Sequence, residues 1–237
     1  MTKKRFLAVI PARGNSKSMR NKNIVDLSGN PLMFYTLDAA KKAKLLDRIV
    51  VSTENWSIKE VALSNGVEVI DRPPELSEDS VNATRPVIHA IQHLQEKENS
   101  YYDYVVLLQP NFPFRKAEQI DEAIERMLEN IENADSVISV TKQDHPPWWL
   151  KQINEDGLLV DFLQYDKSKR TERQHFPSTY ALQGCIYIAQ SDLLIQKGLF
   201  NLLERSLPYV MNEISAMEIE KAEDIEIADF YMKVKGY

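Results

Sequence analysis

The chain has 237 residues, of which 43% are hydrophobic and 27% charged, and its formal net charge is −6. These proportions are those of an ordinary folded protein, and the length allows one large α/β domain or a core with a small appendage. The acidic balance argues against nucleic acid as a main partner, because phosphate backbones select basic surfaces. No apolar run approaches the roughly 20 residues that a membrane-spanning helix needs, so we expect no membrane partner.

The cysteine content and the N-terminus bear on the compartment. A single cysteine, Cys185, excludes a disulfide within the chain and fits a reducing compartment. Residues 1–5 are basic, but the apolar run 6–12 that follows is too short for a secretory signal peptide and is soon interrupted by Arg13. We therefore expect the protein to be cytoplasmic.

Apolar runs alternate with amphipathic stretches along most of the chain. Strands are predicted at 5–11, 47–52, 67–70, 103–109, 135–141 and 184–189, and helices near 31–44, 56–65, 84–98, 116–131, 190–197 and 222–234. The first five strands are almost continuously hydrophobic, which is typical of strands buried on both faces of a parallel sheet. This alternation predicts an α/β fold with a doubly wound, mostly parallel sheet.

The alternation stops at about residue 142. Residues 143–178 contain two adjacent prolines, two adjacent tryptophans and a charged stretch at 166–173. We interpret the chain as a single domain, 1–237, from which 143–178 projects as an arm or lid. The aromatic residues favour a role for this arm in dimerisation, because aromatic side chains are enriched at subunit interfaces.

A basic loop follows the first predicted strand. Residues 10–23 contain four cations and no carboxylate, in a chain whose net charge is negative. Loops at the carboxyl ends of strands are where open α/β sheets bind ligands, and small polar residues there let backbone N–H groups approach an anion. The loop predicts a polyphosphate site, most simply for a nucleoside triphosphate; a solvated basic turn is the alternative. It matches neither a P-loop nor a dinucleotide-binding glycine motif.

Three further segments accompany this loop: RPPELSEDS at 72–80, LLQPNFPFR at 107–115 and MEIEKAED at 217–224. With the opening IPARGNSK, they resemble the motifs of the bacterial acylneuraminate cytidylyltransferases (CMP-sialic acid synthetases), in the same order. The resemblance covers nearly the whole chain. It implies a Rossmann-like nucleotidyltransferase fold, a homodimer and a Mg²⁺-dependent reaction. In that reaction CTP and a 2-keto-3-deoxy sugar acid give the CMP-sugar and pyrophosphate.

The resemblance also assigns residues to the nucleotide. Arg13, Lys17 and Lys22 match the positions that bind phosphate and support catalysis. The nucleotide-binding positions are matched by Ala12, Arg13, Asn15, Ser16, Asn23, Arg72 and Gln109. An amide such as that of Gln109 both donates and accepts hydrogen bonds, which suits a cytosine edge or a sugar hydroxyl.

The sugar-binding positions depart in part from the family pattern. Gln109, Arg173 and Tyr187 match it, whereas Gln183 stands where the family has asparagine. The resemblance implies that Arg173 holds the substrate carboxylate, which a guanidinium can do in a bidentate fork. The changed neighbours favour a sugar acid other than N-acetylneuraminate, such as legionaminate, pseudaminate or a related nonulosonate. Asn111 and Phe112 replace threonine and serine of the family motif.

Glu218 and Glu220 match two family aspartates and are the candidate ligands for Mg²⁺. Alternation along a strand places residues two apart on one face, so we expect the two carboxylates to converge at the sheet edge. Mg²⁺ prefers such oxygen ligands and keeps several waters. The alternative is a solvated acidic strand end.

Two other functions remain open at this point. One is nucleotidyl transfer to a sugar 1-phosphate, although enzymes of that class typically open with a glycine-rich signature that this loop lacks. The other is a nucleotide-binding descendant of the fold without turnover, which the two glutamates at aspartate positions favour. His89 and His93 have the spacing of a metal pair on a helix, but no third ligand accompanies them, so a helix surface is expected.

Overall fold

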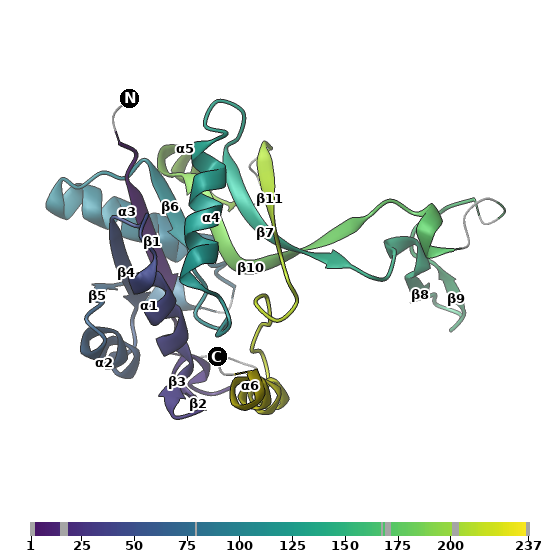
Figure 1. Cartoon of the computed structure of the whole chain (residues 1–237), viewed down its shortest axis with the longest axis horizontal. Coiled ribbons are helices and arrows are strands. Elements are labelled where there is room, and N and C mark those ends of the chain that lie inside the picture. Colours follow the sequence, from purple (N-terminus) through teal and green to yellow (C-terminus); the bar gives the residue numbers. More distant parts are fainter. Residues whose placement is uncertain are drawn as a thin grey trace.

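The structure is a computed structural model that describes residues 3–14, 19–78, 80–166, 168, 172–200 and 204–235. Its centre is a seven-stranded sheet with the strand order β11-β7-β10-β6-β1-β4-β5 (Figure 1). These strands are β1 (Phe6–Pro11), β4 (Arg48–Thr53), β5 (Glu68–Asp71), β6 (Tyr104–Leu107), β7 (Ser136–Gln143), β10 (Thr179–Gln190) and β11 (Ser206–Met211). All neighbouring strands are parallel except where β10 pairs with β6 and with β7.

Helices cover both faces of the sheet. One face carries α1 (Leu32–Lys42), α2 (Trp56–Ser64) and α4 (Ala117–Leu128), and the other carries α3 (Thr84–Glu98) and α5 (Ser191–Lys197). Alternate side chains of β1 enter the two apolar clusters, with Ala8 on one side and Val9 on the other, so the strand has to be apolar throughout. The predicted doubly wound, mostly parallel sheet is confirmed. Among the helices of the described ranges, none is both long and apolar enough to cross a membrane.

The antiparallel strand β10 contains an irregularity that shapes the site described below. Its pairing with β7 shifts register between Leu182 and Tyr187. The buried hydroxyl of Ser139 in β7 bridges the gap, accepting the Ile186 N–H at 2.9 Å and donating to the Gln183 carbonyl. The Ser139 side chain therefore replaces the backbone hydrogen bonds between β7 and β10 that are interrupted from Leu182 to Tyr187.

Residues 144–178 leave the sheet between β7 and β10 and project far from the core (Figure 1). They contain a small antiparallel hairpin of β8 (Lys151–Ile153) and β9 (Leu159–Asp161). Beside it Trp148 stacks on Phe176, with ring centroids 5.2 Å apart, and Phe176 is buried. The excursion predicted from the sequence thus has an aromatic cluster of its own.

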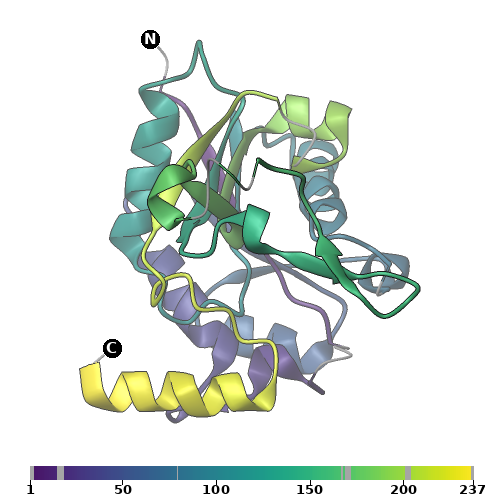
Figure 2. The same ribbon diagram turned by 90° about the vertical axis from the view of Figure 1, so that its right-hand side faces the viewer.

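The C-terminal part of the chain was less well predicted. Strand β11 was missed because Pro208 interrupts its sequence; it lies at the edge of the sheet and pairs only with β7, where a missing N–H is tolerated. The last helix, α6 (Ala222–Lys235), lies across one end of the molecule (Figure 2). It packs in a third apolar cluster made by Leu27, Leu32, Phe114, Ile219, Ala228 and Met232. Leu27 belongs to a short hairpin of β2 (Asp26–Leu27) and β3 (Asn30–Pro31).

Replacing Ser139 with alanine should lower the free energy of unfolding by about 1–3 kcal/mol, because a backbone N–H and a carbonyl lose their partner within the sheet. Urea denaturation followed by circular dichroism measures this change. Ser136→Ala in the same strand is the matched control, since the Ser136 hydroxyl is hydrogen-bonded to another side-chain hydroxyl, that of Ser206, at 2.6 Å. Equal losses in both variants would contradict the bridging role of Ser139.

Candidate functional site

A pocket of about 240 Å³ opens at the carboxyl ends of β1 and β6, the edge of the sheet where α/β proteins bind ligands. Its walls combine two cations and two carboxylates with amides and small apolar groups. They are formed by Pro11, Arg13, Lys22, Asn23, Val81, Ala83, Gln109, Pro110, Asn111, Glu218 and Glu220. Six of the residues predicted from the sequence are therefore brought together: Arg13, Lys22, Asn23, Gln109, Glu218 and Glu220.

The basic wall begins where β1 ends. Ala12 is buried and continues the pairing with β4, its N–H donating to the Ser52 carbonyl at 3.0 Å. The Asn23 amide then donates to the Arg13 carbonyl at 2.9 Å and so joins the two ends of the basic loop. The Lys22 ammonium lies 3.7 Å from the Glu220 carboxylate across the pocket. The predicted Asn15, Ser16 and Lys17 lie outside the described residues.

The acidic wall is not the strand end that the sequence suggested. Residues 217–220 form an irregular segment, although both predicted carboxylates still line the pocket. Neighbouring segments hold it in place: the Ile219 N–H donates to the Asn111 carbonyl at 2.9 Å, and the Asp224 carboxylate accepts the Glu220 N–H at 2.8 Å. The two side chains converge through these anchors and not through strand alternation.

Glu218 is the more buried of the two carboxylates. The Asn111 amide donates to its Oε1 at 2.9 Å. Burial raises the pKa of Glu218, and the nearby Glu220 carboxylate adds to this; the Asn111 hydrogen bond and the Lys22 charge act in the opposite direction, but the pKa remains raised. The surroundings of Glu218 therefore disfavour its ionised form, and a positive charge placed beside it would favour that form.

The pair of carboxylates fits a hard divalent cation. Mg²⁺ is typically held by one or two carboxylates, with waters and substrate phosphates supplying the remaining ligands. Within the described ranges no three histidine, cysteine, aspartate or glutamate side chains gather as a metal site. Glu218 and Glu220 can thus supply part of an octahedral ligand set, and an all-protein cage is not available from the described residues.

The position of Gln109 is tightly constrained. A Cβ atom on Gly184, in the irregular part of β10, would lie 2.1 Å from Gln109 Nε2, so the glutamine side chain lies against this glycine. The Gln109 carbonyl accepts a hydrogen bond from Arg115 at 3.1 Å. Arg115 is buried and also donates to the Cys185 carbonyl at 2.6 Å and to the Thr36 hydroxyl at 2.5 Å. One guanidinium therefore ties the end of β6 to β10 and α1.

The predicted sugar-binding residues fall into two groups. Gln183 and Tyr187 are half-buried in β10, Gln183 within its irregularity and Tyr187 where regular pairing resumes, and Gln183 donates to the Thr141 hydroxyl at 3.3 Å. Burial raises the pKa of Tyr187, and the charge of Glu218 raises it further; Tyr187 does not line the pocket. Arg173 lies instead on the arm.

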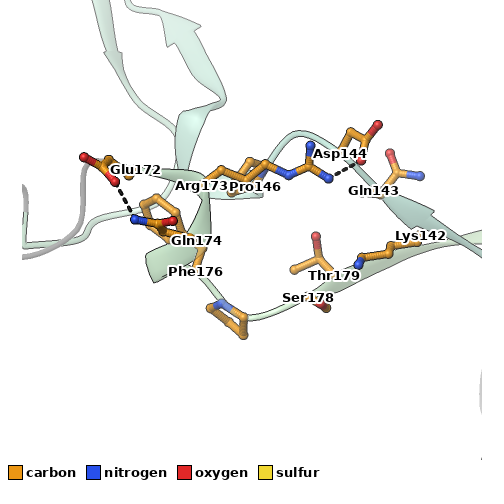
Figure 3. A pocket seen from close by; sticks show the side chains of 11 residues that line it. Lys142, Gln143, Asp144, Pro146, Glu172, Arg173, Gln174, Phe176, Ser178 and Thr179 are labelled. Carbon is orange, nitrogen blue, oxygen red and sulfur yellow. Dashed lines mark hydrogen bonds and ion pairs between the residues drawn. The ribbon is translucent and has the colours of Figure 1, made fainter.

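A second pocket, of about 480 Å³, surrounds Arg173 on the arm (Figure 3). Arg173 pairs there with Asp144 and is about half exposed. The two pockets have no lining residue in common, and the arm extends away from the sheet (Figure 1). Within one chain the structure does not bring Arg173 to Gln109, Gln183 and Tyr187.

Arg72 is close to the first pocket but does not line it. Its side chain is buried, and Nε donates to Glu54 at 2.9 Å. Sequence reasoning missed Glu54, as well as the contact of Asn111 with Glu218. Glu54 had a usable signal, because it directly follows β4 at the same edge of the sheet as Arg13; Asn111 was noted only as a departure from the family motif.

The protein is thus an α/β protein with a doubly wound sheet, and its pocket at the strand ends has a cationic wall facing a carboxylate pair, a lining that suits a phosphate-bearing ligand with a divalent cation. The model of the family described as "Cytidylyltransferase" matches residues 7–228. The chain belongs to this family. The resemblance inferred from its four motifs is confirmed.

Curated relatives agree with this assignment. The chain is 34% identical to CMP-N,N'-diacetyllegionaminic acid synthase of Legionella pneumophila, over 97% of both chains. It is 28% identical to pseudaminic acid cytidylyltransferase of Campylobacter jejuni, over 96% of both chains. It is also 30% identical to N-acylneuraminate cytidylyltransferase of Escherichia coli, over 94% of this chain but only 51% of the relative. The chain thus spans about half the length of that relative.

A solved structure carries the same fold. It is that of CMP:2-keto-3-deoxy-manno-octonic acid synthetase complexed with CTP, with a TM-score of 0.72 and 13% identity over 98% of this chain and 99% of the other. The Rossmann-like α/β fold that the resemblance implied is confirmed.

The raised pKa of Glu218 predicts a pH-dependent effect on stability. In a fold that raises a carboxyl pKa, the stabilisation is present at low pH and is lost as pH rises through the raised pKa. Glu218→Gln should therefore stabilise the protein at pH 7 and have little effect at pH 4, as measured by urea denaturation without divalent cations. The exposed Glu213→Gln is the control. A Glu218→Gln variant that is less stable than wild type at pH 7 would contradict this prediction.

Proposed function

We propose that the protein is an enzyme that uses CTP to activate a 2-keto-3-deoxy sugar acid, releasing pyrophosphate. The substrate class is the nonulosonates: sialic, legionaminic, pseudaminic or related acids. One observation carries the proposal: a chain of the cytidylyltransferase family places Arg13 and Lys22 opposite Glu218 and Glu220 in one pocket at its strand ends. The names of relatives that align over nearly their full length support the substrate class.

The nucleotide would lie along the basic wall. Arg13 and Lys22, with Lys17 of the loop, would neutralise the triphosphate and support catalysis. Ala12, Asn15, Ser16, Asn23, Arg72 and Gln109 complete the proposed nucleotide-binding set. The guanidinium of Arg72 is close enough to Arg13 for their charges to interact, although Arg72 does not line the pocket. The sugar hydroxyl attacks the α-phosphorus in line as pyrophosphate leaves, so the protein acts mainly by positioning and by neutralising charge.

Glu218 and Glu220 would hold Mg²⁺, which when bound would supply positive charge to the triphosphate. Asn111 orients Glu218 through a hydrogen bond at 2.9 Å, and Lys22 lies on the side of Glu220. These contacts keep the two carboxylates directed into the pocket. Each glutamate is one methylene longer than the aspartate of the family motif, and the hydrogen bond from Asn111 restrains the extra length of Glu218.

The sugar acid would lie beside Gln109, Gln183 and Tyr187, with its carboxylate on Arg173. Because Arg173 lies on the projecting arm, we infer that it enters the pocket of a second copy of the chain. Residues 143–178 would then be a dimerisation arm that also covers the partner's sugar site, within a single domain, 1–237. The arm and the ribbon leading to it expose large apolar side chains that such a dimer would bury: Leu150, Ile153, Leu159, Phe162, Tyr180 and Leu182. A homodimer working in the cytoplasm, where CTP is supplied, follows from the proposal.

Pyrophosphate release tests the reaction. The protein is incubated with each nucleoside triphosphate, Mg²⁺ and a panel of nonulosonic acids and sugar 1-phosphates, and EDTA should abolish turnover. We expect release only with CTP and a 2-keto acid. In the same assay Arg13→Ala and Lys22→Ala should each lower kcat/KM on the order of 100-fold, because a preorganised charge contact of this kind contributes about 3 kcal/mol.

Arg20→Ala is the matched control, because it removes an exposed cation from the same loop. Turnover with sugar 1-phosphates would show the other nucleotidyltransferase class, and no turnover with any pair would favour a binding protein. Near-normal rates for Arg13→Ala and Lys22→Ala would mean that the loop is only a surface turn.

The arm has its own prediction. Replacing 144–178 with a short glycine turn between β7 and β10 should leave the sheet folded, because Gln143 and Thr179 already pair across the ladder. Light scattering should show a dimer for the full chain and a monomer for the shortened one, with pyrophosphate release lost. A full chain that is a monomer with full turnover would rule out this role.

A further inference from the structure

Glu54 is an acidic residue placed beside a basic loop. It directly follows β4, whose last residues pair with the end of β1, where Pro11 faces Ser52. Its side chain is only 20% exposed, and it does not line the nucleotide pocket. A buried carboxylate at this position would repel a triphosphate unless its charge were neutralised, so its partners matter.

Three donors from two segments converge on the Glu54 carboxylate. Oε1 accepts the backbone N–H of Gly14 at 2.7 Å. Oε2 accepts Nε of Arg72 at 2.9 Å and the hydroxyl of Ser77 at 2.5 Å. Nη2 of Arg72 also lies 2.8 Å from Oε2, and the arginine side chain is 3% exposed. Glu54 therefore joins the start of the basic loop to the segment that contains Arg72.

The charges in this cluster compensate one another. Burial alone would raise the pKa of Glu54, but the hydrogen bonds from Ser77 and Gly14 and the charge of Arg72 outweigh it, and the pKa lies below its usual value. The carboxylate is thus ionised and paired. Because both contacts of Arg72 use Nε and Nη2, its other terminal nitrogen, Nη1, is not occupied by Glu54.

The same carboxylate fixes the direction in which the chain leaves β1. The N–H of Gly14 is taken by Glu54, so this amide is not available to an anion. Gly14 itself lies against the next residue: a Cβ atom there would be 2.4 Å from Asn55 Nδ2. Residues 54–55 therefore determine where Arg13, immediately before Gly14, is presented to the pocket.

We propose that Glu54 is a positioning residue for the nucleotide site, which holds Arg72 and the start of the basic loop as one hydrogen-bonded unit. The proposal rests on the proposed function, because the ligand of the pocket that Arg13 lines is taken to be CTP. Its specific consequence is that loss of Glu54 weakens binding of CTP and leaves binding of the sugar acid unchanged.

Calorimetric titration of the full chain with CTP and Mg²⁺, without sugar acid, tests this role. We expect Glu54→Ala to weaken CTP binding on the order of tenfold or more, because small misplacements of positioned groups are costly. Glu54→Gln should weaken it less, since its amide oxygen still accepts the Gly14 N–H. In turnover assays the KM for CTP should rise, and the KM for the sugar acid should stay within about twofold of wild type.

A double-mutant cycle shows whether Glu54 acts through Arg72. Glu54→Gln should cost less in an Arg72→Met background than in wild type, because the guanidinium it positions is already gone. Additive losses would overturn the link. Glu68→Gln is the matched control, because Glu68 also pairs with an arginine, Arg48, at 2.5 Å, at the amino end of β5.

The outcomes separate the two proposals. If wild-type protein does not bind CTP, the proposed function fails. If wild type binds CTP and a folded Glu54→Ala binds it equally well, the positioning role alone is wrong. If Glu54→Ala does not fold, Glu54→Gln decides: a change in unfolding temperature without any change in CTP affinity would overturn the inference.

Discussion

The parallel alignment of β1, β4 and β6 is the constraint on which the rest of this molecule depends. Because these strands run in the same direction, their carboxyl ends lie side by side at one edge of the sheet. The three loops that leave these strands therefore begin next to one another. Arg13, Glu54 and Gln109 each follow one of these strands. The sheet itself thereby brings together residues that are 40 or more positions apart in sequence.

The two carboxylates near this edge, those of Glu54 and Glu218, differ in how far neighbouring donors and cations compensate their charge. Glu54 is fully compensated by Arg72 and two further donors, so it acts as an internal anchor. Glu218 is compensated only in part, by Asn111 and Lys22, and its pKa stays raised. The first carboxylate joins two segments of the site through its hydrogen bonds, whereas the surroundings of the second disfavour its ionised form. The different roles proposed for the two follow from how many donors face each of them.

The sequence predicted the sheet well because β1, β4 and β6 are short, mainly apolar runs, too short for helices and typical of strands buried on both faces. The resemblance also pointed to six residues that line the pocket in the structure, whereas Arg72 and Arg173, which it assigned to the same site, do not line it. Sequence reasoning missed β11, where Pro208 marks an edge strand, and it wrongly made a strand of 217–220, whose shape is set by contacts to Asn111 and Asp224. Glu54 was not predicted because its hydrogen-bond partners are distant in sequence, and the spacing of residues along the chain does not reveal such contacts.

The arm begins and ends at residues that face each other across a ladder, Gln143 in β7 and Thr179 in β10. The arm therefore takes the place of the loop of a β-hairpin between β7 and β10, and the pairing of these strands does not depend on its length or sequence. A chain built this way can acquire, lose or exchange the whole projection without altering strand order or the register of the core. Under the proposed function, the part that holds Arg173 and the part that holds the nucleotide could then change independently, and one nucleotide-binding core could be combined with arms suited to different sugar acids.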